Sequence, residues 1–155
     1  MNKIESFTID HLKLKKGLYV SRKDRKNDFV VTTFDLRFTT PNVDQPMSIS
    51  ALHTIEHLFA TFLRNSDKKE DIVYFGPMGC RTGCYLIMFG DLSSQSVYDL
   101  VVNACDFVIN FSGNIPGASA IECGNYLDHD LYGAKEYVKA YKKALIEEKN
   151  LNYPI

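Results

Sequence analysis

Apolar positions alternate with polar ones in some segments of the chain and recur every three to four residues in others, which separates expected strands from expected helices. Strands are predicted where this alternation coincides with β-branched and aromatic residues. These segments are 17–21, 29–38, 71–75 and 85–89. Residues 1–16 also alternate and are expected to form a strand or an extended arm. The charged run at 22–28 is interpreted as a solvated hairpin loop.

Three helices are predicted from apolar residues at helical spacing. The first follows a capping serine at 48 or 50 and ends near 65–66, the second follows Ser93 or Ser94, and the last runs from about 133 to 149. The elements do not repeat as regular βαβ units. The pattern therefore predicts an α+β fold in which a mostly antiparallel sheet packs against helices, with residues 1–155 forming a single domain.

Composition narrows the class of protein. A chain of 155 residues suits one domain. Its 18 Lys and Arg residues are balanced by 19 Asp and Glu residues, which argues against a nucleic-acid partner. Since no window holds about 18 consecutive apolar residues, no membrane partner is expected. The first residues lack an apolar signal segment, so we expect a cytoplasmic protein.

The strongest chemical signal is the segment 53–57, with sequence HTIEH, inside the first predicted helix. His53 and His57 are four residues apart and so share one helix face, where both can bind one metal ion. Glu56 lies near that face and can act as a base, as in H-x-x-E-H metallopeptidases. Two surface histidines on an amphipathic helix would give the same pattern. A site therefore needs a third ligand.

Cys123 is the candidate third ligand, because it follows a glycine-containing loop at 112–119 that can approach the helix. A set of one cysteine and two histidines suits zinc, ferrous iron or cobalt. His129 competes for the same role and is interpreted as a surface histidine.

The other cysteines have different surroundings. Without an export signal or a Cys-x-x-Cys pair, neither disulfides nor a zinc knuckle are expected. Cys105 lies in an apolar helical run and is predicted to be a small buried side chain. Cys80 lies in a turn rich in glycine and proline, where Arg81 could favour its thiolate. It is either a reactive thiol or a loop cysteine without a role.

Five motifs in order resemble one known family. They are SFTIDH at 6–11, DLRF at 35–38 followed by Pro41-Asn42, HTIEH at 53–57, GPMGCRTG at 76–83 and ECGN at 122–125. Together they resemble S-ribosylhomocysteine lyase, the LuxS family, which makes the precursor of the bacterial quorum-sensing signal autoinducer-2. The likeness extends from Ser6 to about the last helix.

The resemblance implies an α+β homodimer with two identical active sites at the subunit interface. It implies one divalent metal per subunit, held by His53, His57 and Cys123, with Fe²⁺ expected and Zn²⁺ or Co²⁺ able to substitute. The implied reaction cleaves the thioether of S-ribosylhomocysteine by two carbonyl migrations and a β-elimination. The products are homocysteine and 4,5-dihydroxy-2,3-pentanedione, and the small-molecule substrate is the only other partner.

The same resemblance assigns further residues. Cys80 and Glu56 are expected to be the acid–base pair. Three residues match substrate contacts, namely Ser6, His11 and Arg37. The sequence departs from some family members at Thr39, where they have cysteine, and at Tyr74, where they have aspartate.

Two other functions fit part of the pattern. A metallopeptidase of the H-x-x-E-H type would use the metal and Glu56 without Cys80. A non-catalytic domain that binds metal or senses redox state would use the cysteines and histidines without turnover. A plain interaction domain would explain none of the five motifs.

Overall fold

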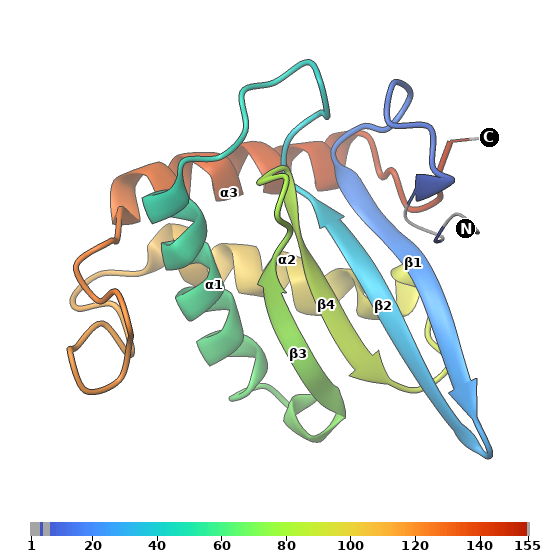
Figure 1. The fold of residues 1–155 in the computed structure, drawn as a ribbon, viewed down its shortest axis with the longest axis horizontal. Helices are drawn as coiled ribbons and strands as arrows, with labels where there is room; N and C mark the ends of the chain where they lie inside the picture. The colour runs from blue at the N-terminus through green and yellow to red at the C-terminus, as the bar shows by residue number, and fades with distance from the viewer. Residues whose placement is uncertain (1–3, 5–6, 155) are drawn as a thin grey trace.

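The computed structural model describes residue 4 and residues 7–154, and its centre is a four-stranded antiparallel sheet in the order β1-β2-β4-β3 (Figure 1). The strands are β1 (Gly17–Lys26), β2 (Phe29–Arg37), β3 (Ile72–Pro77) and β4 (Gly83–Phe89). The helices are α1 (Ile49–Leu63), α2 (Ser94–Asn110) and α3 (Leu131–Glu147), with a short 3₁₀ turn η2 (Lys69–Asp71). The expected α+β class with an antiparallel sheet is confirmed.

Polar side chains fix where the helices begin. The Ser48 side chain accepts a hydrogen bond from the Ala51 N–H at the start of α1. Ser93 and Ser96 form a reciprocal capping box at the start of α2. Asp130 caps α3, which begins two residues before the expected 133. No helix in the described part of the chain has both the length and the apolar character needed to cross a membrane.

The two faces of the sheet have different roles. Phe34 of β2 and Leu86 of β4 are fully buried in the core, which lies on the face toward the helices. Figure 1 shows the sheet in front of α2 and α3, and none of the helices in the described residues covers its other face. Because side chains alternate along a strand, that open face carries Asp35, Tyr85 and Ile87.

The charged run at 22–28 forms the expected hairpin turn only in its last two residues, and the rest of the run is not a loop. It continues β1 to Lys26, after a bulge between Val20 and Arg22, and the turn is confined to Asn27 and Asp28. Asn27 has a φ of 52°, a left-handed conformation that asparagine tolerates. The charges are compatible with a strand because β1 lies at the sheet edge, where side chains reach water.

The segment before β1 and the edge strand β3 border the sheet on its two sides. Described residues 7–16 contain turns and no strand, so the expected strand is absent there and the arm is not regularly extended. At the other edge, the Arg64 guanidinium donates to the carbonyl oxygens of Ile72 and Val73 in β3, at 3.4 and 3.0 Å. That contact occupies two backbone acceptors of the edge strand.

Candidate functional site

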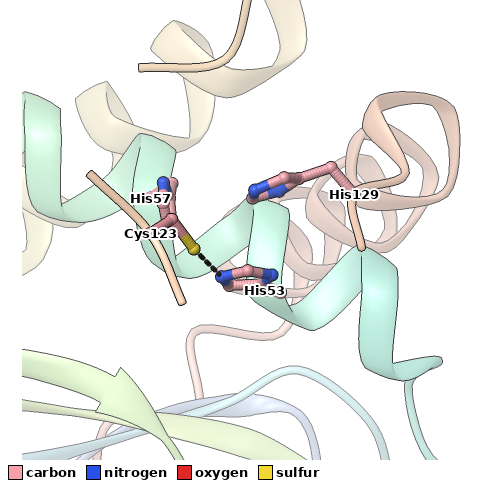
Figure 2. Close-up of side chains that lie close together, drawn as sticks. All are labelled: His53, His57, Cys123 and His129. Atoms are coloured by element: carbon pink, nitrogen blue, oxygen red, sulfur yellow. Dashed lines mark hydrogen bonds between the residues drawn. The ribbon is translucent and has the colours of Figure 1, made fainter. Parts of the chain in front are cut away.

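Four side chains with metal-binding atoms gather where α1 meets the loop between α2 and α3 (Figure 2). His53 and His57 lie one turn apart on α1, as their spacing predicts. Cys123 comes from the loop, and His129 stands just before α3. Their candidate ligand atoms all lie within 4.8 Å of one another. The structure therefore brings together the three residues expected to bind metal and adds His129.

Hydrogen bonds prepare two of the imidazoles for a metal. Nδ1 of His53 is 2.9 Å from the Asp128 carbonyl oxygen, and Nδ1 of His57 is 2.7 Å from that of Pro116. Since a carbonyl oxygen only accepts, both Nδ1 atoms carry the proton. The lone pair of each ring is then on Nε2, the usual arrangement of metal-bound histidine.

The position of Cys123 fits the same group. Its Sγ lies 3.4 Å from Nε2 of His53. A tetrahedral site with bonds of about 2.0 Å to nitrogen and about 2.3 Å to sulfur separates these two ligand atoms by about 3.5 Å. The Asn125 N–H also donates toward the sulfur, at 3.4 Å. These three side chains therefore fit a divalent metal.

His129 lies beside this group in a different orientation. Its ring is stacked on that of His53, with centroids 4.1 Å apart and planes 18° apart. An imidazole binds a metal in the plane of its ring, so one ion cannot lie in the planes of both stacked rings. The rings of His53 and His57, in contrast, are inclined by 88°. The geometry favours Cys123 over His129 as the partner of this histidine pair.

The expectation that His129 is a surface histidine does not hold. Thr54 Oγ1 donates its only proton to the Ser50 carbonyl, at 2.9 Å, so Nδ1 of His129 must donate to Thr54, at 3.1 Å. The lone pair is then on Nε2, which is buried and has no hydrogen-bond partner among the described residues. The residue adjoins the metal group and has a structural bond to α1.

Gly117 lets the loop come close to α1. Its φ is 73°, and a Cβ at this position would stand 3.2 Å from Nδ1 of His57. A larger residue would therefore press on the ring whose Nδ1 bonds to Pro116. The loop is further tied to α1 by a hydrogen bond from the Ser50 hydroxyl to the Asp128 carboxylate.

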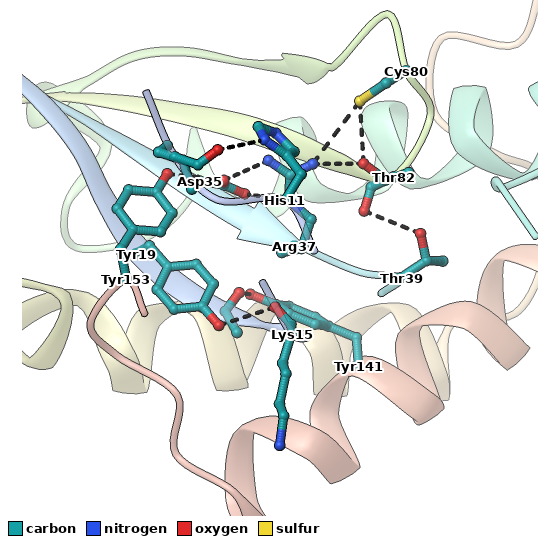
Figure 3. Close-up of polar contacts among 12 residues, drawn as sticks. His11, Lys15, Tyr19, Asp35, Arg37, Thr39, Cys80, Thr82, Tyr141 and Tyr153 are labelled. Carbon is teal, nitrogen blue, oxygen red and sulfur yellow. Dashed lines mark hydrogen bonds and ion pairs between the residues drawn. The ribbon is translucent and has the colours of Figure 1, made fainter. Parts of the chain in front are cut away.

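Cys80 belongs to a second group, in the turn between β3 and β4 (Figure 3). The residue is exposed, as expected. Its Sγ lies 3.1 Å from Thr82 Oγ1 and 3.9 Å from Arg37 Nη1. Arg37 Nη1 also donates to Thr82 Oγ1, at 2.6 Å, so the threonine proton is available to the sulfur.

These contacts adjust the acidity of the thiol. Partial burial raises the pKa of Cys80, but hydrogen bonds from Thr82 and the charge of Arg37 outweigh it, so the pKa is lowered. The cation is not Arg81, contrary to the sequence interpretation, because Arg81 Nη1 donates to the Met47 carbonyl at 3.2 Å. Arg37 reaches the turn because β2 pairs with β4 in a register that sets it opposite Gly83.

Arg37 is itself held by a buried carboxylate. Its Nε and Nη2 donate to the two oxygens of Asp35, at 3.1 and 2.6 Å. The two residues are two apart on β2 and therefore share a face, a signal that was available in the sequence. Sequence reasoning missed Asp35, Thr82 and Tyr153, and the Tyr153 hydroxyl donates to Asp35 at 2.9 Å. No pattern in the sequence pointed to Tyr153.

A cavity of about 330 Å³ lies beside Cys80. Its lining includes His11 and Arg37, two of the expected substrate contacts, and none of the three proposed metal ligands. Nδ1 of His11 donates to the Ile9 carbonyl at 2.9 Å, which leaves Nε2 as an acceptor. Ser6, the third expected contact, lies outside the described residues.

Tyr74 and Thr39, where the sequence departs from some family members, lie close to the expected catalytic residues in different ways. Burial raises the pKa of Tyr74, and the negative charge of Glu56 raises it further. Thr39 is buried, and its hydroxyl donates to the Thr82 carbonyl at 3.4 Å. Thr39 therefore supports the turn that carries Cys80.

Comparison with known proteins agrees with these observations. The sequence model of the family described as S-Ribosylhomocysteinase (LuxS) matches residues 4–152. A protein of Finegoldia magna named S-ribosylhomocysteine lyase is 53% identical over 99% of both chains. A protein of the same name from Clostridium acetobutylicum is 52% identical over 99% of both chains. Another from Borreliella burgdorferi is 53% identical over 99% of this chain and 100% of its own.

Proposed function

The chain belongs to the S-ribosylhomocysteinase (LuxS) family, and from this membership we propose how its residues cleave S-ribosylhomocysteine. It is an enzyme, a carbon–sulfur lyase. The observation that carries the assignment to these residues is the donor set of His53, His57 and Cys123, with both Nδ1 protons committed to carbonyls. A metallopeptidase is not favoured, because the relatives are lyases and the third donor is a thiol.

The metal-binding residues in this proposal are His53, His57 and Cys123, one set per subunit. When bound, a divalent metal supplies Lewis-acid stabilisation of negative charge on a substrate oxygen. Fe²⁺ is the proposed ion, and Zn²⁺ or Co²⁺ can replace it, since two imidazoles and one thiolate suit all three. The orphan Nε2 of His129 stands beside the group and can accept a hydrogen bond there.

Cys80 and Glu56 are the proposed proton-transfer groups. Moving a sugar carbonyl from C1 to C2, and then to C3, requires a proton to leave one carbon and another to reach its neighbour. Once the carbonyl is at C3, removing the C4 proton expels the C5 sulfur as a thiolate, which takes up a proton to give homocysteine. The enol that remains is protonated at C5 and becomes 4,5-dihydroxy-2,3-pentanedione. The Cys80 thiolate, stabilised by Thr82 and Arg37, suits the role of base. Glu56, which precedes His57 on α1, is the second proposed group.

Three residues are proposed to bind the substrate. His11 offers Nε2 to a substrate hydroxyl in the cavity beside Cys80. Arg37 lines the same cavity as a fixed positive charge. Ser6 completes the set by resemblance alone.

A homodimer with the active sites at its interface is part of the proposal. The cavity beside Cys80 contains no metal ligand, so a complete site needs the metal group from elsewhere. The helix-free sheet face carries the half-exposed aromatic rings of Tyr74 and Phe89, which a second copy can cover. A cytoplasmic location is proposed because all four cysteines are free, as a reducing compartment requires.

Thiol release from S-ribosylhomocysteine tests the function directly. Protein purified without oxygen and analysed for metal is expected to release homocysteine at a rate proportional to its bound divalent metal. Loss of activity in air would identify ferrous iron, and an air-stable enzyme would identify zinc or cobalt. A metal-loaded dimer that releases no thiol would overturn the proposal, and cleavage of a peptide by the same preparation would favour the metallopeptidase.

A further inference from the structure

The segment after α3 returns to the sheet and is anchored there. The Asn150 carbonyl accepts from the Leu18 N–H at 3.0 Å, and the Asn150 side-chain amide donates to the Lys16 carbonyl at 2.9 Å. Three residues further on, the Tyr153 ring stacks on Tyr19 with centroids 4.8 Å apart. This end of the chain is therefore docked against β1 and the arm before it (Figures 1 and 3).

Docking places the Tyr153 hydroxyl on the Asp35 carboxylate, at 2.9 Å from Oδ2. Burial and the Asp35 charge raise the pKa of Tyr153 far above its usual value, so the hydroxyl remains a donor at every working pH. Asp35 is 1% exposed, so water contributes little to its solvation. Its carboxylate is instead satisfied by two bonds from Arg37 and one from Tyr153.

The next contacts lead to the thiol. Because Nε and Nη2 of Arg37 are held by Asp35, the remaining Nη1 is directed at Thr82 Oγ1, 2.6 Å away, and at Cys80 Sγ, 3.9 Å away. A carboxylate free to turn would leave the guanidinium free to turn with it. The orientation of the cation beside Cys80 thus depends on how firmly Asp35 is fixed.

We propose that Tyr153 is a positioning residue for the Cys80 thiol, acting through Asp35 and Arg37. Its hydroxyl fixes the carboxylate, the carboxylate fixes the guanidinium, and the guanidinium stabilises the thiolate. Tyr153 also lines the cavity beside Cys80, so the C-terminal segment forms one wall of the proposed substrate site. This inference rests on the proposed function in one respect, which is that Cys80 has a role in the reaction.

Alkylation of Cys80 tests this inference without turnover. Iodoacetamide modification of the metal-loaded protein is followed against pH, with Cys80 identified by peptide mass. Tyr153→Phe keeps the stacked ring and removes the hydroxyl. It is expected to raise the midpoint of the profile by about half a pH unit, which lowers the rate below the midpoint about threefold. The other titratable residues that line the cavity, namely His11, Asp35 and Tyr85, are present in both the wild type and the variant.

The matched control is Tyr19→Phe. Tyr19 is the other ring of the stack, but its hydroxyl donates to the Lys15 carbonyl and not to Asp35. The control is expected to keep the wild-type profile. An unchanged profile in Tyr153→Phe, or an equal shift in Tyr19→Phe, overturns the inference. Failure of the proposed function is distinguishable, because Cys80→Ala would then retain turnover while the Tyr153→Phe shift persisted.

Discussion

Asp35 and Arg37 form an ion pair through two hydrogen bonds, and their side chains are only 1% and 4% exposed. Removing the carboxylate leaves a buried guanidinium without its partner, which typically costs 3–5 kcal/mol. We therefore expect Asp35→Ala to lower the free energy of unfolding by about that amount. Urea unfolding followed by circular dichroism measures the change.

An exposed ion pair provides the comparison. Lys139 and Glu136 are paired at 2.8 Å on α3 with side chains 53% and 50% exposed. Solvent and salt screen such pairs, so Glu136→Ala is expected to lower the free energy of unfolding far less than Asp35→Ala does. Equal losses in the two variants would show that burial of the Asp35 pair contributes no additional stability.

The lowered pKa of Cys80 predicts its response to pH. A thiol with a lowered pKa is ionised at a lower pH than free cysteine, so its alkylation should reach half its maximal rate at a lower pH as well. Thr82→Val removes a hydrogen bond to the sulfur and should raise that midpoint. Thr32→Val, on the same strand as Arg37 but bonded to Gly90, should leave it unchanged. A Thr82→Val midpoint equal to that of the wild type contradicts the prediction.

Metal retention separates the ligands from their neighbour. His57→Ala removes one of three proposed ligands and is expected to lose the metal on dialysis. His129→Ala removes the ring stacked on His53 and its hydrogen bond to Thr54, but no proposed ligand, and is expected to retain the metal. Elemental analysis gives the stoichiometry, and cobalt-loaded protein reports thiolate ligation by its charge-transfer absorption. Full metal content in His57→Ala, or its loss in His129→Ala alone, would reverse the assignment.

Turnover separates Cys80 from the buried cysteines. Cys80→Ala should keep its metal and lose at least about 100-fold in kcat, the usual contribution of a general base. Cys105 is fully buried in α2, and burial raises the pKa of its thiol, so Cys105→Ala should keep normal turnover. Thiol release from S-ribosylhomocysteine measures both. Normal kinetics in Cys80→Ala would remove this residue from the mechanism.

Helix α1 and the placement of its two histidines were predictable, because both depend on short-range spacing. Apolar residues at intervals of three and four define α1, and the same geometry sets His53 above His57. The third candidate ligand was harder to predict, since Cys123 reaches α1 through a loop whose close approach depends on Gly117. Sequence could name Cys123 and His129 as rivals, but only the ring planes distinguish them.

The surroundings of Cys80 depend on strand pairing and could not be derived from neighbours in sequence. Arg81 is adjacent in the chain and bonds elsewhere, while Arg37 arrives through the register of β2 with β4. The charged half of β1 was predicted to be a loop for a related reason. A strand at the edge of a sheet can carry charged side chains in place of the usual apolar alternation. Whether a strand lies at the edge depends on how the whole sheet is arranged.

The two borders of the sheet decide how copies of this chain can associate. Five consecutive charged residues, 22–26, run along β1, and Arg64 occupies two carbonyl oxygens of β3. Copies that pair edge strand to edge strand would need accessible backbone groups at both edges of the sheet, and such an assembly can grow without limit. Pairing of copies through these borders is therefore disfavoured, and the proposed dimer would use the broad faces instead, where a twofold arrangement is complete after two copies. Charge at the margins thus protects the chain against fibre formation.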